Sequence, residues 1–275
     1  MRITGCVCRA AELFENESRG WVHSAYHNTV NLKVKDSLFA LHPDTIPMTP
    51  LSLQTDRRES GILTAEPGQP AFFQGNVLWI GGQKITCQSP RIYDPRLKAA
   101  PGWEELHLLA DAVYQVLPLY KNRQDPVLMH ALEKGKGWKA QKSRIPDPAA
   151  GKYLRSLIGL GNGLTPSGDD FLSGILFFLT AAGKKGEKWL ELTAEAVRDG
   201  LDETGHISRE FLYRGLLGEF GEKMTALAEE GAGKGNLTQA VCRAAETGHS
   251  SGLSALLGIL FSWELLKQEF PENSV

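Results

Sequence analysis

The hydrophobic pattern of this 275-residue chain changes its period near residue 100, and that change constrains the fold more than any other feature. Before it, short alternating or β-branched runs separated by turn residues predict strands. After it, apolar residues recur at spacings of three and four, the period of a helix that buries one face. We therefore predict an α+β chain with a β-rich N-terminal domain over residues 1–100, an antiparallel sandwich or barrel, and a mainly helical domain over residues 101–275.

The predicted strands and helices follow from these two hydrophobic periods. Strands are expected at Ile3–Cys8, Trp21–Ala25, Thr29–Val34, Ser37–Leu41, Gly61–Thr64, Asn76–Ile80 and Lys84–Cys87. Helices are expected at about 103–117, 126–134, 149–158, 167–183, 187–201, 206–217, 220–231, 236–247 and 251–268.

Composition removes several classes of function. Lys plus Arg is 30 and Asp plus Glu is 32, a net charge of −2, so the chain lacks the general basic field that binding a nucleic-acid backbone requires. Its longest apolar stretch, Phe171 to Ala182, is too short to span a bilayer, and its start lacks the apolar region of a signal peptide. The four cysteines, at 6, 8, 87 and 242, have no zinc-type spacing, and we predict no metal ligands. We expect a cytoplasmic protein without nucleic-acid or membrane partners.

The strongest indication of function is a glycine-rich loop that leads into a predicted helix. Gly159, Gly161 and Gly163 precede Pro166, and either Thr165 or Ser167 is expected to cap the helix. Such a loop presents backbone N–H groups to an anion such as phosphate or carboxylate. The loop matches neither a P-loop nor a dinucleotide fingerprint.

Two adjacent carboxylates, Asp169 and Asp170, follow this loop in the first helical turn. One acid there is favourable with the helix dipole, but two beside an anion site would repel the anion. Three resolutions are open: Mg²⁺ bridges the acids to a phosphate, the ligand carries N–H donors for a carboxylate, or both acids are structural caps.

The start of this helix is repeated 84 residues later. Residues 167–178 and 251–262 share seven of twelve positions, including an initial Ser-Gly and a glycine six residues after the first one. Glycine inside a helix favours close approach of another backbone. We predict that the two helices pack together and that their N-termini converge on one ligand.

Other candidates flank this pair. His249 lies on a glycine-flanked connection where an imidazole can donate to a ligand, and Thr204 and Ser208 open another helix whose Arg209 can bind a carboxylate. A basic segment, Lys134 to Arg144, is either a solvated loop or a cationic flap over an anionic ligand. The predicted ligand-binding residues are Gly161, Asn162, Gly163, Thr165, Ser167, Gly168, Thr204, Ser208, Arg209, Ser250 and Ser251; the predicted catalytic residues are Asp169, Asp170 and His249.

The segment from Gly161 to Gly174 (GNGLTPSGDDFLSG) resembles the signature of the bacterial family that includes AllH, a subunit of oxamate carbamoyltransferase in allantoin breakdown. Residues 248–252 (GHSSG) and the Thr204, Ser208 and Leu212 stretch resemble two further motifs of that family, so the resemblance covers about residues 90–262. It implies transfer between carbamoyl phosphate and oxamate, giving oxalurate and phosphate or the reverse. It also implies partner subunits.

The residues fit that chemistry in outline, since carbamoyl phosphate offers a phosphate to loop amides and an NH₂ to a carboxylate. Two alternatives remain at this point: a non-catalytic subunit that binds a small anion or regulates its partners, and a Mg²⁺-dependent phosphotransferase or hydrolase. No cofactor is certain, and Mg²⁺ is an expectation only.

Overall fold

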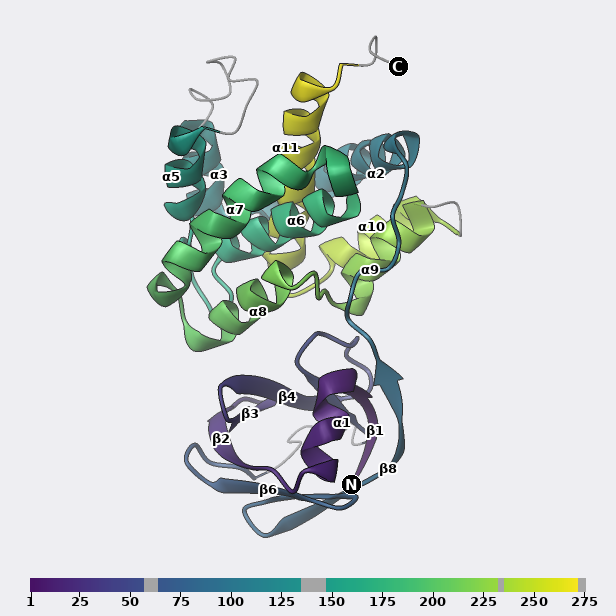
Figure 1. Cartoon of the computed structure of the whole chain (residues 1–275), viewed down its shortest axis with the longest axis vertical. Coiled ribbons are helices and arrows are strands. Elements are labelled where there is room, and N and C mark those ends of the chain that lie inside the picture. Colours follow the sequence, from purple (N-terminus) through teal and green to yellow (C-terminus); the bar gives the residue numbers. More distant parts are fainter. Residues whose placement is uncertain (57–63, 135–146, 232–234, 272–275) are drawn as a thin grey trace. The chain divides into compact units, whose positions relative to one another are not determined.

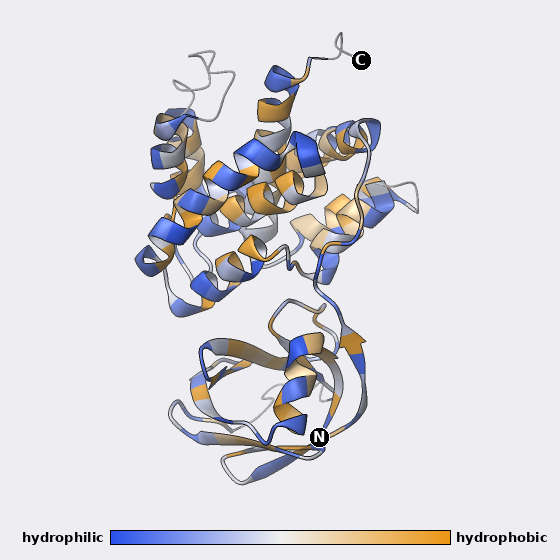
Figure 2. Ribbon diagram, viewed as in Figure 1, coloured by the Kyte–Doolittle hydropathy of each residue, from blue (hydrophilic) through white to orange (hydrophobic). Residues whose placement is uncertain are grey.

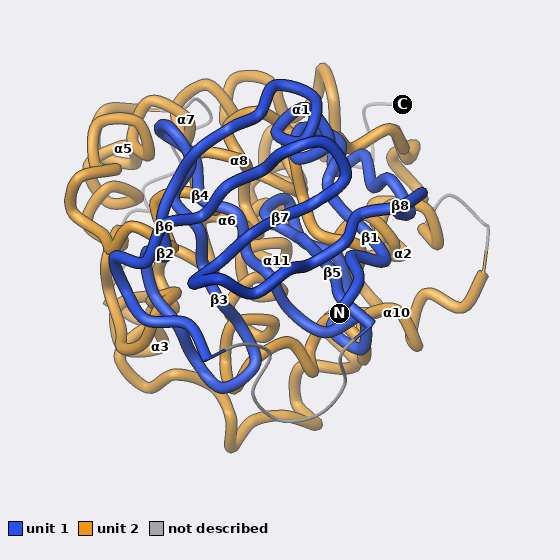
Figure 3. The backbone as a smooth tube through the Cα atoms, turned by 90° about the horizontal axis from the view of Figure 1, so that it is seen from below, with its two compact units in different colours: residues 1–95 blue, residues 96–275 orange. Residues whose placement is uncertain are grey.

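A computed structural model of the chain describes residues 1–56, 64–134, 147–231 and 235–271. The chain divides into two compact units, Met1–Pro95 and Arg96–Val275 (Figures 1 and 3). Each unit has its own hydrophobic core. The predicted strand at 61–64 and the basic segment 134–144 fall almost entirely outside the described residues. No helix in the described ranges is both long and apolar enough to cross a membrane.

The first unit is a closed barrel of eight strands in the order β1-β5-β4-β3-β2-β6-β7-β8. The strands are β1 (Arg2–Val7), β2 (Arg19–Ala25), β3 (Val30–Val34), β4 (Ser37–Pro43), β5 (Ser52–Thr55), β6 (Pro70–Gln74), β7 (Val77–Ile80) and β8 (Gln83–Tyr93). One helix, α1 (Cys8–Glu15), adds Leu13 and Phe14 to the barrel core, where Phe14 packs edge-on against Phe73. The α+β class with a barrel-like N-terminal half is therefore confirmed.

The prediction of a purely antiparallel sheet is wrong. The pairs β1–β8 and β4–β5 are parallel, and the other six pairs are antiparallel. The antiparallel pairs that are consecutive in sequence, β2–β3, β3–β4, β6–β7 and β7–β8, are joined by short hairpins, whereas β4 reaches β5 through residues 44–51, a connection long enough to return in the same direction. The sequence pattern also missed α1, β5 and β6. β5 is not predicted because three of its four buried residues, Ser52, Gln54 and Thr55, are polar, so the sequence shows no apolar alternation there.

The second unit is helical. Its elements are α2 (Trp103–Val116), η1 (Leu117–Arg123), α3 (Pro126–Lys134), α5 (Pro148–Arg155), α6 (Ser167–Ala181), η2 (Gly183–Lys185), α7 (Glu187–Gly200), η3 (Leu201–Glu203), α8 (His206–Leu216), α9 (Glu222–Glu229), α10 (Leu237–Ala245) and α11 (Ser251–Glu269). Every helix predicted from periodicity is present, with ends shifted by a few residues at most.

Helices α6 and α11 form the centre of this unit. Most of their residues are buried, and each packs more extensively on the other than on any other helix. Helices α7 and α8 lie against α6, whereas α2 and α10 lie against α11. Figure 2 shows the corresponding pattern, with apolar residues facing the middle of the unit and polar residues on the outer faces of α5 and α7.

Candidate functional site

The loop before α6 takes the shape that its glycines predict. Gly159, Gly161 and Gly163 all have positive φ angles, of 70°, 115° and 97°. A Cβ on Gly159 would lie 2.6 Å from the carbonyl oxygen of Glu203, so this glycine also allows the loop to approach the start of α8. The loop is thereby fixed between α6 and the residues that precede α8.

The helix itself begins without a side-chain cap. Pro166 is the N-cap residue, and neither Thr165 nor Ser167 accepts a capping hydrogen bond, so both predicted cap registers are wrong. The carbonyl of Pro166 accepts from the amides of Asp169 and Asp170 at 2.9 and 3.1 Å, and Leu160 accepts from Gly168 at 2.8 Å. The side chains of the first turn are therefore available for other contacts.

Several amides of the loop have no acceptor. The N–H groups of residues 161–165 and of Ser167 donate to nothing in the parts of the chain that the structure describes. No atom lies within 4 Å of a Cβ built on Gly163, so the loop borders open space at that point. Unpaired amides at a helix start are the feature that anion binding uses.

Asp169 is buried and fully hydrogen-bonded. One carboxylate oxygen accepts from the Gly159 amide at 2.8 Å, and the other accepts from the hydroxyls of Thr204 and Ser208, the latter at 2.6 Å. These three donors neutralise its charge locally and connect the loop, α6 and α8. The geometry assigns Asp169, Thr204 and Ser208 a positioning role, and a catalytic role for Asp169 stays a prediction.

Asp170, the next residue, has the opposite environment. Its Oδ2 atom is buried and has no hydrogen-bond partner among the described residues. Burial, with the neighbouring charge of Asp169, raises the pKa of Asp170 to about 7, against the opposing effect of the Ser251 and Thr165 hydroxyls. The carboxyl group is therefore partly protonated near neutral pH, which reduces the repulsion that two adjacent acids would exert on an anion.

The second helix start lies beside the first, as the repeat predicts. The hydroxyls of Thr165 and Ser251 are 3.1 Å apart, and those of Ser167 and Ser250 are 3.5 Å apart. The prediction that the N-termini of α6 and α11 converge is thus confirmed. Four hydroxyl groups and the Asp170 carboxyl meet at this junction, which we call the α6–α11 junction.

Sequence reasoning missed two residues of this region. Asp125 accepts from Ser167 Oγ at 2.8 Å while its other oxygen caps α3 through the amides of Val127 and Leu128. Arg123 donates to the carbonyls of Gly248 and His249 and so holds the loop before α11. An Asp before Pro126 is a recognisable cap signal, but nothing in the sequence connects either residue to a loop more than forty positions away.

The remaining predicted site residues lie around the junction and differ in their exposure and in the groups that they contact. His249 is exposed, and its imidazole has no hydrogen-bond partner within the described ranges. Asn162 and Gly163 are exposed on the loop, whereas Gly168 is buried, because its Cα lies close to the Leu157 carbonyl. Arg209 contacts the carbonyl of Leu201 and the carboxylate of Asp202. It is thus engaged in the turn before α8, and its role as a ligand stays a prediction.

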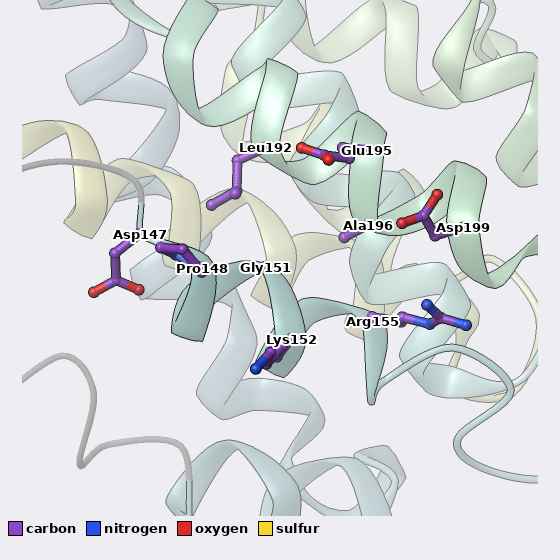
Figure 4. A pocket seen from close by; sticks show the side chains of 9 residues that line it. All are labelled: Asp147, Pro148, Gly151, Lys152, Arg155, Leu192, Glu195, Ala196 and Asp199. Atoms are coloured by element: carbon purple, nitrogen blue, oxygen red, sulfur yellow. The ribbon is translucent and has the colours of Figure 1, made fainter.

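A hollow of about 450 Å³ lies between α5 and α7 (Figure 4). It is lined by charges of both signs, including Lys152, Glu195 and Asp199, and by none of the predicted site residues. Arg155 on its edge is already paired with Glu203 at 2.6 Å. The described residues also include no group of three or more His, Cys, Asp or Glu side chains that could hold a metal.

Comparison with protein families shows to which family the chain belongs. Residues 157–263, which contain every residue of the α6–α11 junction, match the family described as oxamate carbamoyltransferase subunit AllH. Residues 3–91, the barrel, match the AllH family N-terminal domain. The chain belongs to the AllH family. It is a subunit of oxamate carbamoyltransferase, a transferase of allantoin catabolism.

As an AllH-family subunit, the chain works with partner subunits and small substrates. The family match starts at Leu157, in the turn that leads into the glycine loop, and ends at Trp263 in α11. The matched segment therefore contains the glycine loop and the starts of α6 and α11 that build the junction. A search of solved structures found no match to the chain.

Proposed function

We propose that the α6–α11 junction of this AllH-family subunit binds carbamoyl phosphate. The unpartnered, buried oxygen of Asp170 beside loop amides without acceptors is the observation that carries the proposal. A buried polar atom without a partner costs free energy, and a bound ligand, water or ion that completes its hydrogen bonds offsets that cost.

The parts of carbamoyl phosphate match the groups around the junction. The phosphate accepts from the amides of residues 161–165 and from the hydroxyl of Ser250, because the Ser167 hydroxyl already donates to Asp125 and the Thr165 hydroxyl to Asp170. Its NH₂ group donates to Asp170, and the exposed imidazole of His249 polarises its carbonyl. We assign the NH₂ contact to Asp170 and not to Asp169, because both oxygens of Asp169 are already occupied by protein donors.

The electrostatics at the junction are compatible with an anion. Asp169 is compensated by three donors, and Asp125 by two amides and a hydroxyl. The raised pKa of Asp170 leaves it partly neutral at pH 7. Binding then positions the carbamoyl carbon, while the amide nitrogen of oxamate forms the new C–N bond, the C–O bond to phosphate breaks and the proton lost from nitrogen leaves with phosphate.

The test is calorimetric titration of carbamoyl phosphate into the purified chain, alone and assembled with its partner subunits. Asp170→Asn is the main variant, because the amide retains the volume but cannot accept as a carboxylate does. We expect binding to weaken at least tenfold in the variant, and inorganic phosphate to compete. Equal binding by the wild type and Asp170→Asn in both samples would refute the proposal.

A second titration, with Mg²⁺, tests the alternative in which a metal ion binds the adjacent acids and the phosphate. The adjacent carboxylates favour it, although the described residues offer no cluster of metal ligands. Carbamoyl phosphate that binds only in the presence of Mg²⁺, with the dependence lost in Asp170→Asn, would show that a metal bridges the junction to the phosphate. Binding that is independent of Mg²⁺ would remove the metal from the site.

A further inference from the structure

The outer surface of the barrel carries aromatic side chains that the barrel core does not use. Trp21 on β2, Phe72 on β6 and Trp79 on β7 are 48%, 40% and 37% exposed, and none of them belongs to the core cluster of that unit. Single exposed hydrophobic residues are common on protein surfaces. Three large rings on three neighbouring strands of one sheet are not explained by the packing of the barrel.

The strand register places these rings side by side. Phe72 pairs directly with Trp79 across β6 and β7, and Trp21 pairs with Pro70 across β2 and β6. Side chains at directly paired positions point to the same face of a sheet, with Cβ atoms about 4.5–5.5 Å apart. The rings therefore form one continuous apolar patch and are not scattered.

Positive charges surround the patch. In the register, Arg19 is opposite Phe72, Lys84 is opposite Trp79, and Lys33 is opposite Trp21. The guanidinium of Arg19 lies 5.8 Å from the Phe72 ring centre, and the ammonium of Lys84 lies 5.9 Å from that of Trp79. We call the three rings and these three cations the aromatic–basic surface.

The described strands that carry this surface have no acidic side chain. The segments that form β2, β3, β6, β7 and β8 contain no Asp or Glu, although the chain as a whole has 32 acids and a net charge of −2. An apolar centre rich in Trp and Phe with charged residues at its rim is the composition of a protein–protein interface. The uniform sign of the rim requires a partner surface with carboxylates around its own apolar centre.

We propose that the aromatic–basic surface docks a partner subunit of the oxamate carbamoyltransferase through an apolar patch bordered by Asp and Glu. This inference rests on the chain being one subunit of an enzyme, and not on the ligand proposed for the α6–α11 junction. A protein partner fits better than a nucleic acid, because these five strands carry only four Lys or Arg residues and the chain is acidic overall.

The test uses the full chain and its partner subunits, with assembly measured by analytical ultracentrifugation. In the double variant Phe72→Ser/Trp79→Ser we expect affinity for the partner to fall at least tenfold, and Lys84→Glu should weaken it and change its dependence on salt. Leu119→Ser is the control, because Leu119 is 74% exposed on η1, outside the surface. It should assemble as the wild type does.

Other outcomes would overturn the proposal. Unchanged assembly of the double variant would do so directly. Self-association of the isolated wild-type chain that the double variant lacks would assign the surface to a second copy, and oligonucleotide binding with the same dependence would assign it to a nucleic acid. A large loss of unfolding stability in the isolated double variant would assign the surface to the chain's own helical unit. Carbamoyl phosphate titrations of the same variants measure ligand binding separately from assembly. They therefore distinguish failure of this docking proposal from failure of the ligand proposal for the α6–α11 junction.

Discussion

The first turns of α6 and α11 share one sequence framework but carry different chemistry. Both begin with Ser-Gly and have a second glycine six residues later. A Cβ on Gly168 or Gly252 would lie about 2 Å from a backbone carbonyl oxygen, at 1.9 Å and 2.0 Å respectively. The repeated glycines therefore have the same function in both copies, which is to let the helices approach neighbouring backbone.

The residues between the glycines differ. Where α6 has Asp169 and Asp170, α11 has Leu253 and Ser254, and both of these are buried. The α11 copy thus continues the core, whereas the α6 copy introduces two carboxylates at the junction. The comparison shows that the repeat supplies the same scaffold twice, and that the two carboxylates distinguish the α6 copy from the α11 copy.

The strongest test of the shared scaffold is to fill the crossing point of the two helices. A Cβ on Gly174 would lie 2.0 Å from the Ala255 carbonyl oxygen, and one on Gly258 would lie 2.1 Å from that of Phe171. We expect Gly174→Ala and Gly258→Ala each to lower the free energy of unfolding by about 3 kcal/mol, despite the better helix propensity of alanine. Urea denaturation measures the change.

The matched control is Gly205→Ala, because no atom lies within 4 Å of a Cβ at that position and its φ is negative. It should cost less than about 1 kcal/mol, the loss of a weak N-cap preference. If only one of the two crossing-point variants is destabilised, the equivalence of the two copies fails.

The next test separates the two adjacent acids. Asp169→Asn removes the charge that holds three donors, from Gly159, Thr204 and Ser208. We expect the free energy of unfolding to fall by about 3 kcal/mol, since buried hydrogen bonds to a charged group are the strong ones. Leu253→Ala, the corresponding α11 variant, should lose stability through its cavity alone, with no change in the pH dependence of unfolding. A stable Asp169→Asn protein would contradict the positioning role.

The companion variant, Asp170→Asn, should change stability in the opposite direction. The pKa of Asp170 is about 7 in the folded protein and near 3.8 in the unfolded chain, so the folded state binds the proton more tightly. Its contribution to stability is complete below pH 4 and is lost as the pH rises through 7. At pH 8 we expect Asp170→Asn to be more stable than the wild type by about 2 kcal/mol, less than the full shift implies because a buried amide also costs free energy.

Unfolding curves at pH 5 and pH 8 provide the measurement. The wild type should lose stability relative to the variant between these two values. A variant that is less stable than the wild type at pH 8 would mean that Asp170 is stabilised by a partner, as Asp169 is, and the contrast between the two acids would disappear.

The smallest expected effect concerns the hydrogen bond that Ser167, at the start of the α6 copy, donates to Asp125. Asp125→Ala removes the cap of α3 and the acceptor for Ser167, and should cost about 1 kcal/mol in thermal or urea unfolding. Ser167→Ala, which removes only the hydroxyl, should cost less. A larger loss from Ser167→Ala than from Asp125→Ala would mean that the hydroxyl has a role beyond this contact.

Much of this architecture can be predicted from local sequence. The change of period separates strands from helices, because the two structures repeat side-chain direction every 2 and every 3.6 residues. The repeated Ser-Gly framework predicts the contact between α6 and α11, since glycine in a helix marks close backbone approach. The motifs of the glycine loop are specific enough to indicate the family.

Other features depend on contacts between distant segments, and only the tertiary structure decides them. The parallel pairs that close the barrel, and β5 with its four buried residues, depend on neighbours that the local pattern does not encode. Asp125 and Arg123 reach the junction across gaps of 42 and more than 120 residues.

Asp169 and Asp170 show most clearly what the local sequence does not decide. They are identical in type and adjacent in sequence, so the sequence determined that two carboxylates stand at a helix start. Only the tertiary structure decided that one accepts three hydrogen bonds while the other keeps a buried oxygen without a partner. The reason is that successive residues of a helix point about 100° apart and so meet different surroundings.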